Sequence, residues 1–66
     1  MNWDVIKGNW KQSKGSVQSR WGELTGDEVD EVAGEREKLE GIIQEKYGKT
    51  KQEAKQDVDD WLAEQK

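Results

Sequence analysis

The chain has 66 residues, of which 39% are charged and 30% hydrophobic, with a net charge of −4 at pH 7; this length suffices for a single domain, expected over residues 1–66. The absence of Cys and His excludes disulfides, thiolate metal sites and imidazole chemistry. No signal-peptide pattern opens the sequence and no apolar run is long enough to cross a membrane, so we expect a cytoplasmic protein without membrane association.

Residues 3–24 are expected to form an amphipathic helix. Apolar residues recur at positions 3, 10, 17 and 24, and glycines at 8, 15 and 22. At about 100° per residue the larger apolar side chains of this segment share one face, and Asn2 is a candidate N-cap. The stretch 12–16 contains Gly15 and no apolar residue, which predicts a kink or break there. The pattern leaves open whether the segment is one long helix or two short ones.

A second helix is expected over residues 26–33, and its start carries the clearest local signal. Thr25 and Glu28 have the spacing of a capping box, and Leu24 occupies the first position of a hydrophobic staple. Gly34 either ends this helix or forms a turn within a longer one. Its inward side chains are expected to be Val29, Val32 and Ala33.

Two further helices are expected in the second half of the chain, over residues 35–47 and after residue 50. Gly48 has the position of a left-handed residue that ends the first of them. Thr50 and Glu53 repeat the capping-box spacing at the start of the last helix. Because only Gly48 and Lys49 connect them, the two helices should be antiparallel neighbours or cross at a short corner.

These elements predict an all-α fold. We expect a small orthogonal bundle of four short helices, or five if the first divides, packed around the Trp residues. The side chains expected in the core are Trp3, Ile6, Trp10, Val17, Trp21, Leu24, Val29, Val32, Leu39, Ile42, Ile43, Tyr47, Ala54, Val58, Trp61 and Leu62.

Charge is unevenly spread along the chain. Residues 1–22 carry a net +3, whereas residues 23–66 carry a net −7. The basic side chains of the first segment could form a face for an acidic partner. Alternatively, this helix docks on the acidic remainder of the chain, or its basic residues are simply a solvated rim. We favour this alternative over an acidic partner. The residues of that candidate basic face are Lys7, Lys11, Lys14 and Arg20.

Two other uses of this basic, Trp-containing segment are disfavoured. Single-strand nucleic-acid binding needs exposed aromatic platforms, but the core needs these Trp side chains, and the isoelectric point is about 4.8. Binding to an anionic membrane surface would require the same Trp stripe, the helix face that carries Trp3, Trp10 and Trp21. The acidic second half of the chain would repel such a surface.

No catalytic, metal or cofactor site is expected, and we do not expect an enzyme. Adjacent carboxylates at 27–28, 30–31 and 59–60 lie on highly charged helical surfaces and not in a converging cleft. The hydroxyl side chains have no evident base, and the glycines recur inside a helix instead of forming a phosphate-binding loop.

Short motifs cover nearly the whole chain: WKQ at 10–12, KG at 14–15, WGxLTxD at 21–27, GxRxxLxG at 34–41, QExYG at 44–48 and VDxW at 58–61. Together they resemble the signature of the CsbD-like family. The resemblance implies a small bacterial protein associated with general stress responses, with a SAM-domain-like array of helices. It implies no characterised biochemical activity and supplies no catalytic residues.

We therefore expect a non-enzymatic stress-response protein that is a cytoplasmic monomer. Its hydrophilic, Gly-containing composition is similar to that of hydrophilins, which favours a protective role. One alternative is a small protein-interaction module that uses the basic first helix, and a second is a weak nucleic-acid binder.

Overall fold

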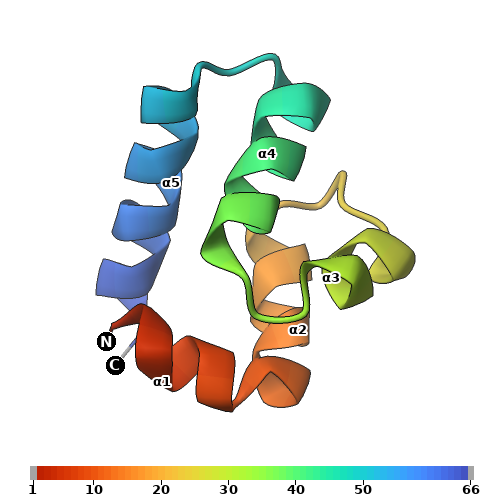
Figure 1. Cartoon of the computed structure of the whole chain (residues 1–66), viewed down its shortest axis with the longest axis vertical. Helices are drawn as coiled ribbons and strands as arrows, with labels where there is room; N and C mark the ends of the chain where they lie inside the picture. The colour runs from red at the N-terminus through yellow and green to blue at the C-terminus, as the bar shows by residue number, and fades with distance from the viewer. Residues whose placement is uncertain (1, 66) are drawn as a thin grey trace.

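The computed structural model describes residues 2–65, and this part of the chain forms five helices and no strand. They are α1 (Trp3–Gly8), α2 (Trp10–Arg20), α3 (Gly26–Val32), α4 (Arg36–Tyr47) and α5 (Lys51–Glu64). Helices α4 and α5 run side by side as an antiparallel pair, and α1 crosses beneath them (Figure 1). Helix α2 rises from the end of α1, and the short α3 packs against both α2 and α4. The predicted all-α class is confirmed, in its five-helix form.

The first segment divides at Asn9, which ends α1 and precedes α2. Its backbone N–H donates to the carbonyls of Val5 and Ile6 at 3.1 and 3.2 Å, and its side-chain amide donates to the Val5 carbonyl at 3.3 Å. The Asn9 carbonyl in turn accepts hydrogen bonds from the N–H and the hydroxyl of Ser13, at 2.9 and 3.0 Å. Because Asn side chains compete for backbone hydrogen bonds, they favour such a break.

The break predicted over residues 12–16 is therefore wrong, since α2 runs through this stretch without interruption. A Cβ built on Gly15 would meet no atom within 4 Å. This glycine is consequently an exposed helical residue that lowers helix propensity without causing a break.

Helix α2 ends at Arg20, four residues earlier than the expected end of the segment. Residues 21–24 form a turn in which the Leu24 N–H donates to the Trp21 carbonyl at 3.0 Å. The N–H of Glu23, instead of continuing the helical ladder, donates to the hydroxyl of Tyr47 at 3.1 Å. This turn is thus tied to the far end of α4, and both Trp21 and Leu24 are buried.

Both predicted capping boxes are confirmed. In each box the Thr hydroxyl accepts a hydrogen bond of 3.1 Å from the backbone N–H of the Glu that follows three residues later. The carboxylate of that Glu accepts a hydrogen bond of 2.9 Å from the backbone N–H of the Thr. The pairs are Thr25 with Glu28 and Thr50 with Glu53. Gly48 ends α4 in the left-handed conformation, with φ of 63°, also as predicted.

Helix α3 ends one residue earlier than expected, because Ala33 is left-handed, with φ of 51°. The prediction that Ala33 points inward is wrong, since this side chain is exposed. Gly34 follows with φ of 81° and is buried, and a Cβ on it would lie 3.1 Å from Cγ of Lys7. The chain therefore turns sharply between α3 and α4, with Gly34 packed against the aliphatic part of Lys7.

The structure places every expected core residue in or against one hydrophobic cluster. Its buried members are Ile6, Val17, Trp21, Leu24, Val29, Val32, Leu39, Ile43, Ala54, Val58, Trp61 and Leu62, and Trp3, Trp10, Ile42 and Tyr47 pack against them partly buried. The four indoles form a continuous series: ring centroids are 5.9 Å apart for Trp10 and Trp3, 6.4 Å for Trp3 and Trp61, and 5.7 Å for Trp61 and Trp21. Tilted and edge-on contacts at such distances are favourable for aromatic pairs.

Candidate functional site

The residues of the candidate basic face have different surroundings in the fold. Lys14 of α2 forms an ion pair with Asp30 of α3, and the Arg20 guanidinium lies 5.7 Å from the ring centroid of Trp21. Lys11 is exposed and has no ion-pair partner within residues 2–65. Lys11 and Lys14 lie one turn apart on α2, whereas Arg20 ends that helix and Lys7 belongs to α1. The Lys14–Asp30 pair is the kind of contact expected if the first segment docks on the acidic remainder.

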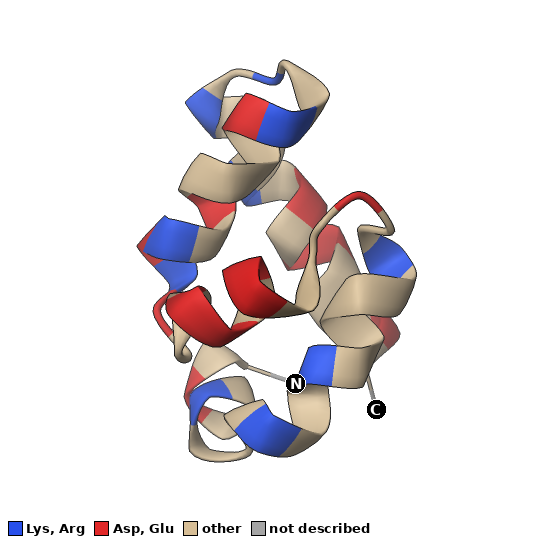
Figure 2. Cartoon of the chain, turned by 90° about the vertical axis from the view of Figure 1, so that its right-hand side faces the viewer, with Lys and Arg blue, Asp and Glu red and all other residues tan. Residues whose placement is uncertain are grey.

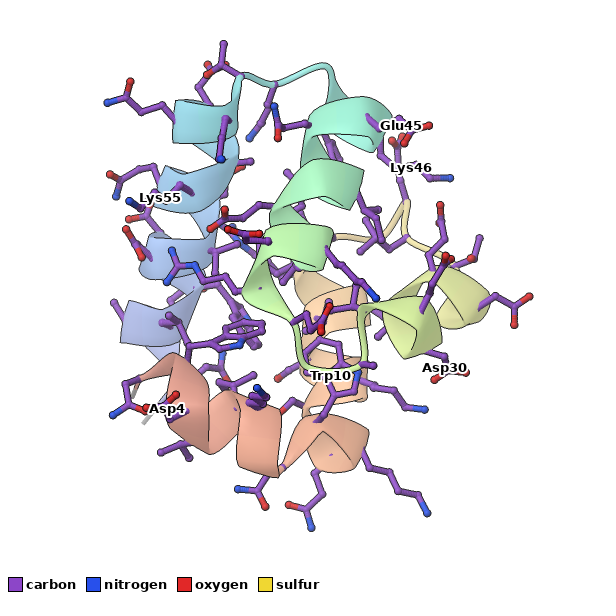
Figure 3. All side chains as sticks on the ribbon, in the orientation of Figure 1. Asp4, Trp10, Asp30, Glu45, Lys46 and Lys55 are labelled. Carbon is purple, nitrogen blue, oxygen red and sulfur yellow. The ribbon has the colours of Figure 1, made fainter. Side chains whose placement is uncertain are left out.

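Two indole N–H groups connect the first segment to α3 and to the link that follows it. Nε1 of Trp3 donates to the carbonyl of Gly34 at 2.9 Å, and Nε1 of Trp10 donates to the carbonyl of Val29 at 3.2 Å. Trp10, labelled in Figure 3, begins α2 and packs partly buried against the core. Sequence reasoning assigned both rings to the core and missed these bonds, although a half-buried indole usually finds an acceptor.

A second missed cluster joins α4 to α5. Nε of Arg36 donates to Glu40 Oε2 at 2.7 Å, and its Nη2 donates to the Lys55 carbonyl at 3.2 Å and to Asp59. Burial disfavours the charged form of Arg36, but the bonds to Asp59 and Glu40 outweigh it and raise the pKa of the guanidinium. Glu40 is buried. The sequence signal for this ion pair was the i,i+4 spacing of Arg36 and Glu40, which places both side chains on one face of a helix. This cluster holds two helices together.

The acidic residues gather on α3, where four of the seven residues carry a carboxylate. In Figure 2, where Asp and Glu are red, most of the α3 ribbon is red. Glu28 accepts hydrogen bonds from the backbone N–H of Thr25 and lies 3.1 Å from the ammonium of Lys46. These two contacts hold the pKa of Glu28 below its ordinary value, so this carboxylate is anionic at neutral pH.

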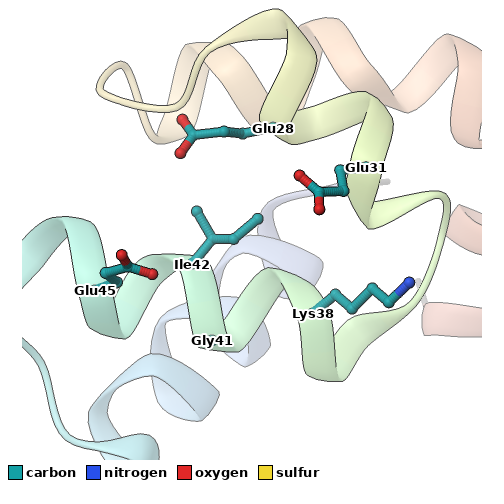
Figure 4. A pocket seen from close by; sticks show the side chains of 6 residues that line it. All are labelled: Glu28, Glu31, Lys38, Gly41, Ile42 and Glu45. Carbon is teal, nitrogen blue, oxygen red and sulfur yellow. The ribbon is translucent and has the colours of Figure 1, made fainter.

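A groove of about 440 Å³ runs between α3 and α4 (Figure 4). Its floor is Ile42, which is partly buried and points into the groove, and Gly41, which presents no side chain. Its lining residues are Glu28, Glu31, Lys38, Gly41, Ile42 and Glu45. The three carboxylates point toward the space around Ile42, whereas the Lys38 ammonium points away and pairs with Glu35 at 3.2 Å.

The groove was not predicted. On α4, however, positions 38, 41, 42 and 45 recur at helical spacing, and such residues share one face of a helix. The face of α4 that carries Ile43 and Leu39 is buried. A sequence signal for the groove therefore existed: one polar stripe of α4 that contains a glycine and an isoleucine.

The sequence signature of the CsbD-like family matches residues 4–56. The chain belongs to the CsbD-like family. This match includes all residues of the α3–α4 groove and both capping boxes.

Individual relatives support the same assignment. A UPF0337 protein of Rhodopseudomonas palustris is 48% identical over 62 residues, 94% of this chain and 94% of its own. A UPF0337 protein of Bordetella pertussis is 50% identical over 58 residues, 88% of each chain. The UPF0337 protein YjbJ of Escherichia coli strain K12 is 49% identical over 61 residues, 92% of this chain and 88% of its own. No solved structure gives a significant match, so the SAM-domain-like topology stays a prediction.

Two other properties of this CsbD-like protein bear on its chemistry. Within residues 2–65, no group of three or more His, Cys, Asp or Glu side chains is arranged to hold a metal ion. None of the helices in this part of the chain combines the length and the hydropathy that a membrane crossing requires. What the described surface offers is charge: carboxylates from α3 and α4 around an apolar floor, of which Glu28 is held in place by Thr25 and Lys46.

Proposed function

We propose that this CsbD-like protein is a non-enzymatic bacterial stress-response protein, a cytoplasmic single-domain monomer that protects other macromolecules when water is limited. The observation that carries the proposal is the surface. Over residues 2–65, Val5 is the one large hydrophobic side chain that is exposed, at 44%. The stress association comes from the family resemblance, and the hydrophilic composition, with 39% charged residues, supports the protective role.

The physical reason lies in what such a surface does between other proteins. Monomeric proteins commonly expose apolar patches of a few hundred Å², and these patches drive association when proteins are concentrated. A small protein that buries its four Trp rings and carries a net charge of −4 stays dispersed and hydrated. Placed between molecules of an enzyme, it keeps their exposed patches apart as water is removed.

The test is recovery of a drying-sensitive enzyme after desiccation or freezing. Equimolar protein should preserve more activity than albumin, and equal preservation would refute the proposal.

A Trp61→Ala variant separates the contribution of the fold from that of the composition, because truncating a fully buried Trp costs about 3–5 kcal/mol. That is comparable to the roughly 3–10 kcal/mol expected as the total stability of such a chain. Since the unfolded variant exposes its remaining indoles, we expect its protection to be lost; full retention would mean that composition alone protects.

The alternative of a partner-binding basic helix has less support. Lys14 is already paired with Asp30, and the aliphatic part of Lys7 packs against Gly34. Lys11 is the basic side chain of this segment best placed to meet an acidic partner. Its charge reversal, Lys11→Glu, should abolish any saturable binding of such a partner, and undiminished binding would remove this alternative.

A further inference from the structure

The groove between α3 and α4 has two carboxylates that the fold itself does not use. Glu31 of α3 and Glu45 of α4 are both exposed, and neither has a hydrogen-bond or ion-pair partner among the residues the structure describes. Glu28, by contrast, is engaged by Thr25 and Lys46. Glu31 and Glu45 come from opposite walls of the groove, with Ile42 between them (Figure 4).

The floor of the groove is apolar and open. Ile42 is partly buried, and nothing lies within 4 Å of the position that a Cβ on Gly41 would take. A glycine inside a helix lowers helix stability relative to alanine, and here it leaves a flat surface beside the isoleucine. The volume of about 440 Å³ falls in the range of pockets that hold ligand groups.

We propose that the α3–α4 groove docks a cationic, amphipathic segment of a partner protein, whose Lys or Arg side chains lie over Ile42 and Gly41 and reach the carboxylates of Glu31 and Glu45. The side chains of Lys and Arg carry an apolar stem and a charged end, and they commonly cover apolar surface while keeping that end in contact with charge or water. An apolar floor between two carboxylates matches both parts of such a side chain.

Charge also decides between a partner and a second copy of this chain. Each copy has a net charge of −4, so two copies repel one another. The basic segment of a second copy has Lys14 committed to Asp30. A cationic segment of another protein is attracted both by the groove and by the whole molecule. This proposal is independent of the protective role, which needs no specific partner.

The experiment is a titration with a synthetic helical peptide that carries Lys and Leu on one face, followed through the backbone amide NMR signals. We expect saturable shifts centred on Gly41 and Ile42. One control peptide replaces Lys by Glu and should not bind; a second replaces Leu by Ser and should bind less tightly. Equal binding of the Ser peptide, or shifts spread over the surface without a centre at the groove, would overturn the proposal.

Two pairs of variants locate the interaction. Glu31→Gln with Glu45→Gln should raise the dissociation constant by about tenfold, which corresponds to the loss of two exposed ion pairs. The matched control, Glu23→Gln with Glu64→Gln, changes the net charge equally outside the groove and should leave the constant nearly unchanged. If both pairs weaken binding alike, net charge and not the groove attracts the peptide, and the proposal fails.

A steric test uses a variant that gains helix propensity. Gly41→Gln fills the groove floor with a neutral side chain, and Gly15→Gln makes the same change on the exposed face of α2. Both should fold, because Gln is a better helix former than Gly. We expect Gly41→Gln alone to weaken binding, and equal affinities of the two variants would contradict a docking site at Ile42.

Discussion

The hydrogen bond from Trp3 to the Gly34 carbonyl can be removed without changing the shape of the ring. Benzothienylalanine is an isostere of Trp in which sulfur replaces the indole N–H, and a 66-residue chain can be assembled by chemical synthesis. The bond is 2.9 Å long and joins the start of α1 to Gly34, the buried residue of the turn after α3. Its loss should cost about 1 kcal/mol, rising to about 3 kcal/mol if the carbonyl finds no water. The melting temperature should then fall by about 4–8 °C for each kcal/mol.

The assay is urea unfolding followed by far-UV circular dichroism, which does not depend on the replaced indole. The same isostere at Trp21 is the control, because that ring is buried yet its N–H has no hydrogen-bond partner within residues 2–65. Stability should be nearly unchanged at position 21 and clearly reduced at position 3. Equal losses at both positions, or none at position 3, would refute the assignment of stability to this bond.

Four other predictions concern the backbone and the caps. Ala33→Gly should raise the free energy of unfolding by about 0.5–1 kcal/mol, because a left-handed residue with a Cβ is strained, and Gly34→Ala should lower it by about 1–2 kcal/mol. Gly15→Ala should raise it by roughly 0.8–1 kcal/mol, since the site is helical and open. The carboxylates of Glu28 and Glu53 have lowered pKa values, caused mainly by the backbone N–H groups of Thr residues that they cap. Their contribution to stability is complete above the ordinary glutamate pKa and is lost as pH falls through the lowered values. The double variant Glu28→Gln with Glu53→Gln keeps the capping geometry and should show a flatter acid limb in urea titrations at a series of pH values.

Controls for these predictions come from the same chain. Ala63→Gly, at an exposed helical position of α5, should destabilise where Ala33→Gly stabilises, and losses at both sites would contradict the strain at position 33. A loss of stability in Gly15→Ala would show that α2 is crowded at that point. Glu64→Gln removes one carboxylate away from both caps; if it flattens the acid limb as much as the double variant does, the caps are not the cause.

The features that could be predicted from the sequence are those with local causes. Each capping box lies within four residues, so Thr25 and Thr50 identify two helix starts without any tertiary information. The left-handed Gly48 is equally local. The Trp stripe followed from periodicity, because side chains on one face of a helix must be buried together.

Two of the errors accompany contacts between residues that are far apart in the chain. Helix α2 ends early where the Glu23 N–H meets the hydroxyl of Tyr47, 24 residues away in the chain. The break at Asn9 accompanies the docking of Trp3 on Gly34, 31 residues away. Ala33 shares the helical spacing of Val29, but the left-handed turn takes it out of the helix and leaves it exposed.

The groove was missed for a related reason. Its carboxylates come from α3 and α4, and no local pattern relates Glu31 to Glu45 until the two helices are packed. The basic residues, by contrast, were predicted from their proximity in sequence. In the fold they belong to two helices, with Lys7 on α1 and the others on α2, and Lys14 is paired with Asp30.

The series of four indoles has an optical consequence. Neighbouring ring centroids are 5.7 to 6.4 Å apart, from Trp10 through Trp3 and Trp61 to Trp21. At such separations electronic excitation passes readily between like chromophores, so the emitted light belongs to the group and not to any single ring. Intrinsic fluorescence of this protein therefore reports the integrity of its whole interior in one signal, and a change in emission cannot be assigned to one tryptophan without replacing the other three.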